Sequence, residues 1–257
     1  MASHSIESVA TTLIVAREQQ RPADAAPLAD VLTSAEQAYA VQALVLRALD
    51  GPDAATVSRH WKSGGPSRTA TLTHAPLPAS GVRSSPADMR DLHFNLRLIE
   101  AEIALRLGQA VTPAQAAALT PETATALLDG MTVSIEVVDS RWQDLPRVPP
   151  LLKLADLQVH GALVLGAWVP FVARDWATQT CEVTIGTQAP QAFAGTHSLG
   201  DPAWLLPTWL RHATRHGQTV PAGTIVTTGT WCGMLKAAAG DRVVARFDGV
   251  GEASVQL

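Results

Sequence analysis

Residues 98–107 read Leu-Ile-Glu-Ala-Glu-Ile-Ala-Leu-Arg-Leu, an apolar run with two carboxylates two positions apart. This β-like run predicts a strand. Because side chains alternate between the faces of a strand, Glu100 and Glu102 should project from one face, with their Cα atoms roughly 7 Å apart. Two neighbouring carboxylates repel each other unless a cation or a proton lies between them.

A second apolar segment, Ser134-Ile135-Glu136-Val137-Val138-Asp139, has the same character. Glu136 would bring a third oxygen ligand to the same point. Carboxylate oxygens alone are typical of a site for Mg²⁺ or Mn²⁺ rather than zinc. The alternative is a solvated strand face, which is common for an isolated Glu-x-Glu. The apolar flanks, Glu136 and the cationic Lys62 together favour the metal hypothesis.

The chain has 257 residues, of which 47% are hydrophobic, so it is long enough to bury a sizeable core. Its 23 acidic and 19 basic residues give a net charge of -4, which argues against a nucleic-acid partner. Cys181 and Cys232 lack a metal-ligand or redox spacing, which fits a protein of the reducing cytoplasm. We expect both side chains to be buried in the protein core. Residues 1–20 do not resemble a signal peptide, and no apolar run reaches the roughly 18 residues of a membrane span. We therefore expect a cytoplasmic, unanchored protein.

Helical patterns come first and strand patterns follow. Residues 1–60 are predicted to form an N-terminal helical region, and residues 61–257 a catalytic β-roll, within one structural domain. Proline, serine and glycine dominate residues 66–89, which predicts an irregular excursion. The expected helices span residues 6–19 and 34–49, two short stretches after Thr112 and Thr120, and residues 201–216. The expected strands span 98–107, 133–138, 161–168, 180–186, 224–228 and 242–247, with a last one from 253. The fold class is therefore α+β, with N-terminal helices packed on a mixed, mostly antiparallel rolled sheet.

Two glycine-punctuated segments are candidates for binding an anion. Lys62 precedes the Ser63-Gly64-Gly65-Pro66 loop, although a lysine beside a turn is also common on a plain surface. Thr228, Gly229 and Thr230 form a hydroxyl cluster suited to a carboxylate, and the alternative is a tight turn.

Asp156 and His160 lie close together in the sequence, and His160 is a candidate general base. A lone histidine before a glycine is more often a structural, hydrogen-bonded residue. The chain contains no His-Glu-x-x-His, Gly-x-Gly-x-x-Gly, Walker-type loop or Gly-x-Ser-x-Gly. Zinc-protease, nucleotide-dependent and serine-hydrolase functions therefore lose support.

The order of these segments resembles the fumarylacetoacetate hydrolase superfamily, and within it the 2-keto-4-pentenoate hydratases and 4-oxalocrotonate decarboxylases of aromatic meta-cleavage pathways. The specific part is the Ile-Glu-Ala-Glu-Ile-Ala string with the downstream Glu136. Corroborating segments are Lys62 with its glycine loop, residues 135–141, Ala155-Asp156, residues 161–166, Thr228-Gly229-Thr230 and Gly240-Asp241. The sequence departs from the usual pattern at Leu157, where asparagine is common, at Ser63, and in residues 75–78, which lack an acid.

The resemblance implies a β-roll like the C-terminal domain of that family and a homo-oligomer. It also implies Mg²⁺ or Mn²⁺ held by Glu100, Glu102 and Glu136, and a Lys62 that contacts the substrate or shuttles protons.

The resulting hypothesis is a metal-dependent lyase acting on a 2-oxo acid or its 2-hydroxydienoate enol, with hydration as the expected reaction. The alternatives are hydrolysis of an acylpyruvate or β-diketo acid, decarboxylation of a 2-oxo acid, and a non-catalytic binding role.

Several residues have expected roles in this chemistry. Lys62 is the first candidate for proton transfer or carboxylate binding, because a lysine that is near a metal and partly desolvated can have a pKa lowered toward neutrality. Secondary catalytic candidates are Asp156 and His160. Candidates for substrate binding are Thr228, Gly229 and Thr230 at the carboxylate, and Trp61 or Trp231 as an apolar wall.

Overall fold

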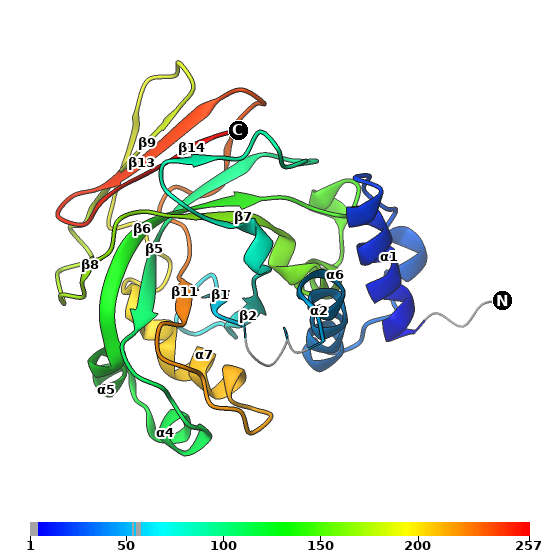
Figure 1. The fold of residues 1–257 in the computed structure, drawn as a ribbon, viewed down its shortest axis with the longest axis horizontal. Helices are drawn as coiled ribbons and strands as arrows, with labels where there is room; N and C mark the ends of the chain where they lie inside the picture. Colours follow the sequence, from blue (N-terminus) through cyan, green and yellow to red (C-terminus); the bar gives the residue numbers. More distant parts are fainter. Residues whose placement is uncertain (1–4, 53, 55–57) are drawn as a thin grey trace.

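The computed structural model describes residues 5–52, 54 and 58–257. Two sheets form the body of the molecule, and the N-terminal helices lie against one side of it (Figure 1). Long strands at the centre curl around the space in which β1 and β11 lie, and a smaller sheet with the C-terminus lies beyond them. The helices are α1 (Ile6–Glu18), α2 (Ala35–Asp50), α4 (Pro113–Ala118), α5 (Pro121–Ala124), α6 (Pro150–Ala155) and α7 (Leu206–Ala213). Short 3₁₀ turns are η1 (Ala26–Leu28), η2 (Ala79–Gly81), η3 (Thr125–Leu127), η4 (Leu145–Arg147), η5 (Leu157–Val159) and η6 (Pro202–Leu205).

In the described part of the chain, the larger sheet has nine strands in the order β2-β1-β11-β5-β6-β7-β3, with β12 beside β5 and β8 beside β6. Its strands are β1 (His60–Gly64), β2 (Thr73–Pro76), β3 (Val82–Ser84), β5 (Leu98–Leu107), β6 (Leu128–Val138), β7 (His160–Leu165), β8 (Val169–Pro170), β11 (Ile225–Thr227) and β12 (Leu235–Lys236). The smaller sheet has the order β10-β9-β13-β14-β4. Its strands are β4 (Ala87–Asp88), β9 (Thr180–Ile185), β10 (Gln191–Ala194), β13 (Arg242–Phe247) and β14 (Gly251–Gln256). Most neighbours are antiparallel, and the pairs β1–β11, β3–β7 and β4–β14 are parallel. The α+β class and the mixed, curled sheet are confirmed.

Residues 98–107 form β5, with the bounds that the sequence predicts. One face of β5 carries Ile99, Ala101 and Ile103, which are fully buried in the main hydrophobic core. The opposite face carries Glu100 and Glu102. Antiparallel pairing with β6 sets Glu100 opposite Glu136, so a third carboxylate reaches the same face.

The N-terminal helices form as predicted. Ser34 caps α2 by accepting a hydrogen bond from the backbone N–H of Gln37. The apolar faces of α1 and α2 are buried with α6 around Trp142, whose indole N–H donates to the Leu152 carbonyl at 3.0 Å. This second core attaches the helices to the segment that follows β6.

Two predictions about the chain path are corrected. Residues 66–89 are not wholly irregular, because β2, β3 and β4 lie within them and pair with β1, β7 and β14. These strands are short and are stabilised by partners distant in sequence, so they leave no periodicity. The expected helix over 201–216 consists of η6 followed by α7, which has Pro207 in its first turn and ends at Ala213.

Among the described residues, no helix has the length and apolar character needed to cross a membrane.

Candidate metal centre

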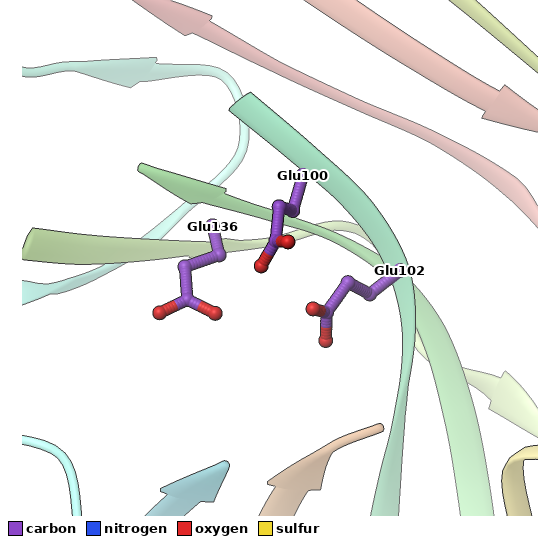
Figure 2. Close-up of side chains that lie close together, drawn as sticks. All are labelled: Glu100, Glu102 and Glu136. Carbon is purple, nitrogen blue, oxygen red and sulfur yellow. The ribbon is translucent and has the colours of Figure 1, made fainter. Parts of the chain in front are cut away.

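Three carboxylates converge on the inner face of the curled sheet. Glu100 and Glu102 extend from β5 and Glu136 from β6, and Figure 2 shows the three side chains pointing toward a common centre. One oxygen from each lies within 4.8 Å of the other two. Glu102 and Glu136 are buried and Glu100 is partly buried. The structure therefore brings together the three residues that the sequence singles out as ligands.

Hydrogen bonds orient two of these carboxylates. Glu102 Oε2 accepts from the backbone N–H of Gly229 at 3.0 Å and from the Thr227 hydroxyl. Glu136 Oε1 accepts from Lys62 Nζ at 2.7 Å and from His160 Nδ1 at 2.8 Å. Glu136 Oε2 is buried and has no hydrogen-bond partner in the described structure. A buried carboxylate oxygen without a donor is costly, and a cation in the cluster would satisfy it.

The pKa values of the three acids diverge. Burial, reinforced by the neighbouring glutamates, raises the pKa of Glu100 to about 8 despite the opposing charge of Lys62. Burial and the charge of Glu136 also raise the pKa of Glu102. Burial acts in the same direction on Glu136, but Lys62 and His160 outweigh it and lower its pKa to about 2. Without a metal, the cluster has more negative charge than its surroundings neutralise. An all-carboxylate donor set fits a hard divalent cation such as Mg²⁺ or Mn²⁺.

Lys62 lies in strand β1 rather than in a glycine loop. Its Nζ donates to Glu136 and to the Gln158 carbonyl, which is 3.2 Å away. Burial opposes the charge of Lys62, but the three glutamates outweigh that effect and raise its pKa. The expected fall of this pKa toward neutrality concerns a lysine beside a bound metal; with the three glutamates alone, Lys62 is a cation beside the cluster.

A cavity of about 270 Å³ opens on the cluster. Lys62, Glu100, Glu102, Gly229 and Thr230 line it, in agreement with their predicted positions. Residues that sequence reasoning missed also line it: Thr227, Gln158 and Ser198.

Two residues that were predicted to contact the substrate, Thr228 and Trp61, do not line this cavity, whereas a chain neighbour of each one does. The Thr228 hydroxyl donates to the Ile103 carbonyl at 2.7 Å, and Thr227 faces Glu102 instead. Trp61 is buried on the opposite face of β1 from Lys62, and its indole N–H donates to the Ser58 carbonyl at 3.1 Å. Successive side chains alternate between the two faces of a strand. Once the strands were known, this alternation would have shown which threonine and which residue of β1 face the cavity.

Trp231 also lies outside the cavity lining. It is buried beside Phe247 and His197, with ring centroids 5.5 Å from each. Its expected role as an apolar wall of the site is therefore corrected.

The two secondary catalytic candidates occupy different places. Asp156 is fully buried and accepts from Arg141 Nε at 2.7 Å and from Arg17 at 3.3 Å, so its carboxylate is used within an ion-pair network and does not line the cavity. His160 is buried behind Glu136, with Nδ1 hydrogen-bonded to that residue and Nε2 without a partner in the described structure. The structure therefore makes His160 a support for Glu136.

The turn before His160 has an uncommon backbone. Leu157, Gln158 and Val159 have φ angles of 49°, 54° and 55°, in the left-handed region that these residue types rarely adopt. The turn presents the Gln158 carbonyl to Lys62. No signal in the residue types predicts it, because asparagine and glycine are the usual markers of this conformation.

Solved structures share this fold over most of the chain. The 4-oxalocrotonate decarboxylase from Pseudomonas putida G7, complexed with magnesium and adipate, matches with a TM-score of 0.82 and 20% sequence identity, over 98% of this chain and 96% of that chain. The 5-carboxymethyl-2-hydroxymuconate delta-isomerase from Mycobacterium smegmatis matches with a TM-score of 0.52 and 16% identity, over 78% of each chain. Residues 78–257, more than half of the sequence, match the fumarylacetoacetate (FAA) hydrolase C-terminal family. The chain therefore belongs to the fumarylacetoacetate hydrolase family.

Proposed function

We propose that the protein is a Mg²⁺- or Mn²⁺-dependent lyase that acts on a 2-oxo acid or its 2-hydroxydienoate enol, with hydration of the kind performed by 2-keto-4-pentenoate hydratases. The observation that supports this proposal is the convergence of Glu100, Glu102 and Glu136 beside a buried Lys62, at a cavity of about 270 Å³. Membership of the fumarylacetoacetate hydrolase family is consistent with it. The substrate would be a small molecule, and the assembly a homo-oligomer in the cytoplasm.

The three glutamates would hold the cation, which when bound supplies Lewis-acid stabilisation of enolate charge. The Gly229 N–H and the Thr227 hydroxyl fix the orientation of Glu102. Lys62 fixes Glu136 and adds a positive charge next to the cavity. These contacts pre-organise the ligands, so that little rearrangement is needed when the substrate binds.

The titratable side chains that line the cavity are Lys62, Glu100 and Glu102, within the described part of the chain. Lys62 is therefore the proposed proton carrier or carboxylate-binding group. Hydrolysis of an acylpyruvate needs a base that activates water. His160 is poorly placed for that role, because Nδ1 is bound to Glu136 and Nε2 is buried. Hydration and hydrolysis both need an activated water, so turnover assays have to separate them.

Decarboxylation of a 2-oxo acid is the second candidate, because it relies on the same stabilisation of enolate charge. The observation that favours it is the fold similarity to 4-oxalocrotonate decarboxylase over nearly the full length of both chains.

Turnover assays test these candidates. Purified protein with Mg²⁺ and 2-hydroxypenta-2,4-dienoate should consume the dienol, followed by its ultraviolet absorbance, and the Glu102→Gln variant should lose this activity. Glu18→Gln removes an exposed carboxylate on α1 and serves as the matched control. Consumption of acylpyruvate but not of the dienol would refute the hydratase proposal, and release of CO₂ from a 2-oxo acid would select the second candidate. Binding of Mg²⁺ and oxalate without any turnover would indicate a non-catalytic member.

A further inference from the structure

A single peptide group separates Glu102 from a buried histidine that the proposed mechanism does not use. His197 lies between β10 and η6 and is 5% exposed. Its Nε2 is 2.9 Å from the Thr228 carbonyl, and because a carbonyl oxygen only accepts, Nε2 carries the proton and donates it. The N–H of the same peptide group belongs to Gly229 and donates to Glu102 Oε2 at 3.0 Å. The two hydrogen bonds therefore act on opposite ends of one peptide group.

The Thr228–Gly229 peptide couples these two bonds. A peptide group is planar, so the direction of its carbonyl fixes the direction of its N–H. Gly229 has a φ of 110° and no side chain to restrict rotation of this peptide. A rotation would turn the N–H away from Glu102 and bring the Thr228 carbonyl oxygen toward that carboxylate. The bond from His197 opposes this rotation, and by polarising the carbonyl it strengthens the N–H as a donor.

Neighbouring contacts hold His197 in place. Its ring packs against Trp231, with ring centroids 5.5 Å apart. The next residue, Ser198, lines the metal cavity, and its hydroxyl donates to the Gly65 carbonyl at 2.8 Å. These contacts on either side of the imidazole fix its Nε2 relative to the metal cavity.

Packing in the core alone does not account for a histidine at this position. Nδ1 of His197 is buried and has no hydrogen-bond partner in the described structure, which is a cost that a leucine would avoid. Burial lowers the pKa of His197 to about 4, so the ring is neutral at pH 7 and adds no charge to the glutamate cluster. The contribution of the imidazole is therefore its Nε2–H donor.

We propose that His197 is a positioning residue for Glu102, and that it acts by holding the Thr228–Gly229 peptide in the orientation that donates to this ligand. The inference rests on the proposed function, because Glu102 is taken as a ligand of the cation. Loss of a group that orients a metal ligand typically weakens metal affinity by about 10- to 100-fold. His197 acts through an intervening peptide group, so we expect an effect of about tenfold, at the lower end of that range.

Titration calorimetry of the metal-free protein with Mg²⁺ measures this effect without turnover. His197→Leu keeps an apolar contact with Trp231 and removes the donor, so its Kd for Mg²⁺ should rise about tenfold. His197→Gln can place an amide N–H near the position of Nε2 and should stay within about twofold of wild type. His197→Asn is one methylene shorter and should behave like the leucine variant. His216→Leu removes an exposed histidine and serves as the control, with an unchanged Kd.

A second measurement needs no cation. In the metal-free protein, amide hydrogen exchange at Gly229 should be faster in His197→Leu and His197→Asn than in wild type and His197→Gln. A purely structural role would lower Tm in every variant and leave glutamine no better than asparagine.

The two amide variants decide the inference even if His197→Leu does not fold. Equal Mg²⁺ Kd values and equal Gly229 exchange in His197→Gln and His197→Asn would overturn the inference, while Mg²⁺ binding by wild type would spare the proposed function. A wild-type Kd in a folded His197→Leu variant would overturn the inference as well. Absence of Mg²⁺ binding by the wild-type protein would instead refute the proposed function, and with it the role of His197 in metal binding.

Discussion

Glu100→Gln should stabilise the metal-free protein and weaken its stabilisation by Mg²⁺. Burial and the neighbouring carboxylates raise the pKa of Glu100 from an ordinary 4.5 to about 8. The carboxyl group therefore keeps its proton at pH 7, whereas it would be ionised in the unfolded chain. Glutamine has nearly the same shape and no such proton equilibrium.

The magnitude follows from linkage. Between pH 4.5 and pH 8 the unfolded chain loses this proton and the folded protein retains it, so the free energy of unfolding falls as pH rises. At pH 7 the accumulated cost is about 3 kcal/mol. Because Glu100 belongs to a cluster of interacting charges, its cost is not independent of its neighbours, and we expect a net gain of about 1–3 kcal/mol. Each kcal/mol raises Tm by about 2–4 °C in a chain of this size.

Thermal unfolding of wild type, Glu100→Gln and the Glu18→Gln control, with EDTA and with Mg²⁺, measures both effects. Mg²⁺ at a hundredfold excess over its Kd stabilises wild type by about 2.7 kcal/mol, and this increment should shrink sharply in Glu100→Gln. A Mg²⁺-induced Tm shift equal to that of wild type would show that Glu100 is not a ligand. A lower metal-free Tm for the variant, with the control unchanged, would refute the electrostatic reasoning.

Three further outcomes follow. Lys62→Met should change the free energy of unfolding in the opposite direction to Glu100→Gln. It should destabilise the metal-free protein by about 3–5 kcal/mol, because it leaves the buried carboxylate of Glu136 without its cation; an unchanged Tm would contradict this. Val159→Asn should raise stability by about 1 kcal/mol in urea unfolding by relieving a left-handed β-branched residue, while Val172→Asn at an exposed position should not; destabilisation by Val159→Asn would count against backbone strain. Burial lowers the pKa of His74 to about 3 and of His212 to about 2, so each remains neutral in the folded protein below pH 6.5. Because Glu100 changes stability in the opposite direction over the same range, the test is the difference between wild type and His212→Asn. The contribution of His212 should be full above pH 6.5 and fall by about 1.4 kcal/mol per pH unit below it; a difference that is flat from pH 7 to pH 5 would exclude this effect.

Local patterns predicted the strand that carries two of the three glutamates of the candidate metal centre. β5 has the predicted bounds because its alternation of buried apolar residues with Glu100 and Glu102 is complete within ten residues. Glu136 was also identified from its apolar flanks. Its position opposite Glu100, however, depends on the register between two strands, which only the folded sheet defines.

Residues whose role depends on distant partners were assigned less well. Asp156 looked like a catalytic acid, but Arg141 and Arg17 bind its carboxylate from other elements. Thr228 was predicted to bind substrate, whereas Thr227 is the residue that faces the cavity. A cluster of hydroxyl residues does not reveal which of them faces inward until it is known which face of the strand each residue occupies. Gln158 reaches the cavity through a left-handed turn, for which its residue type carries no signal.

The charges of the candidate metal centre explain why a divalent cation suits it. Three carboxylates and one ammonium leave two negative charges when all four groups are ionised. Because the pKa of Glu100 is raised to about 8, a proton on this group compensates part of the charge near pH 7. A cation of charge two neutralises the cluster and displaces that proton, so Mg²⁺ binding should release a proton and strengthen as pH rises toward 8.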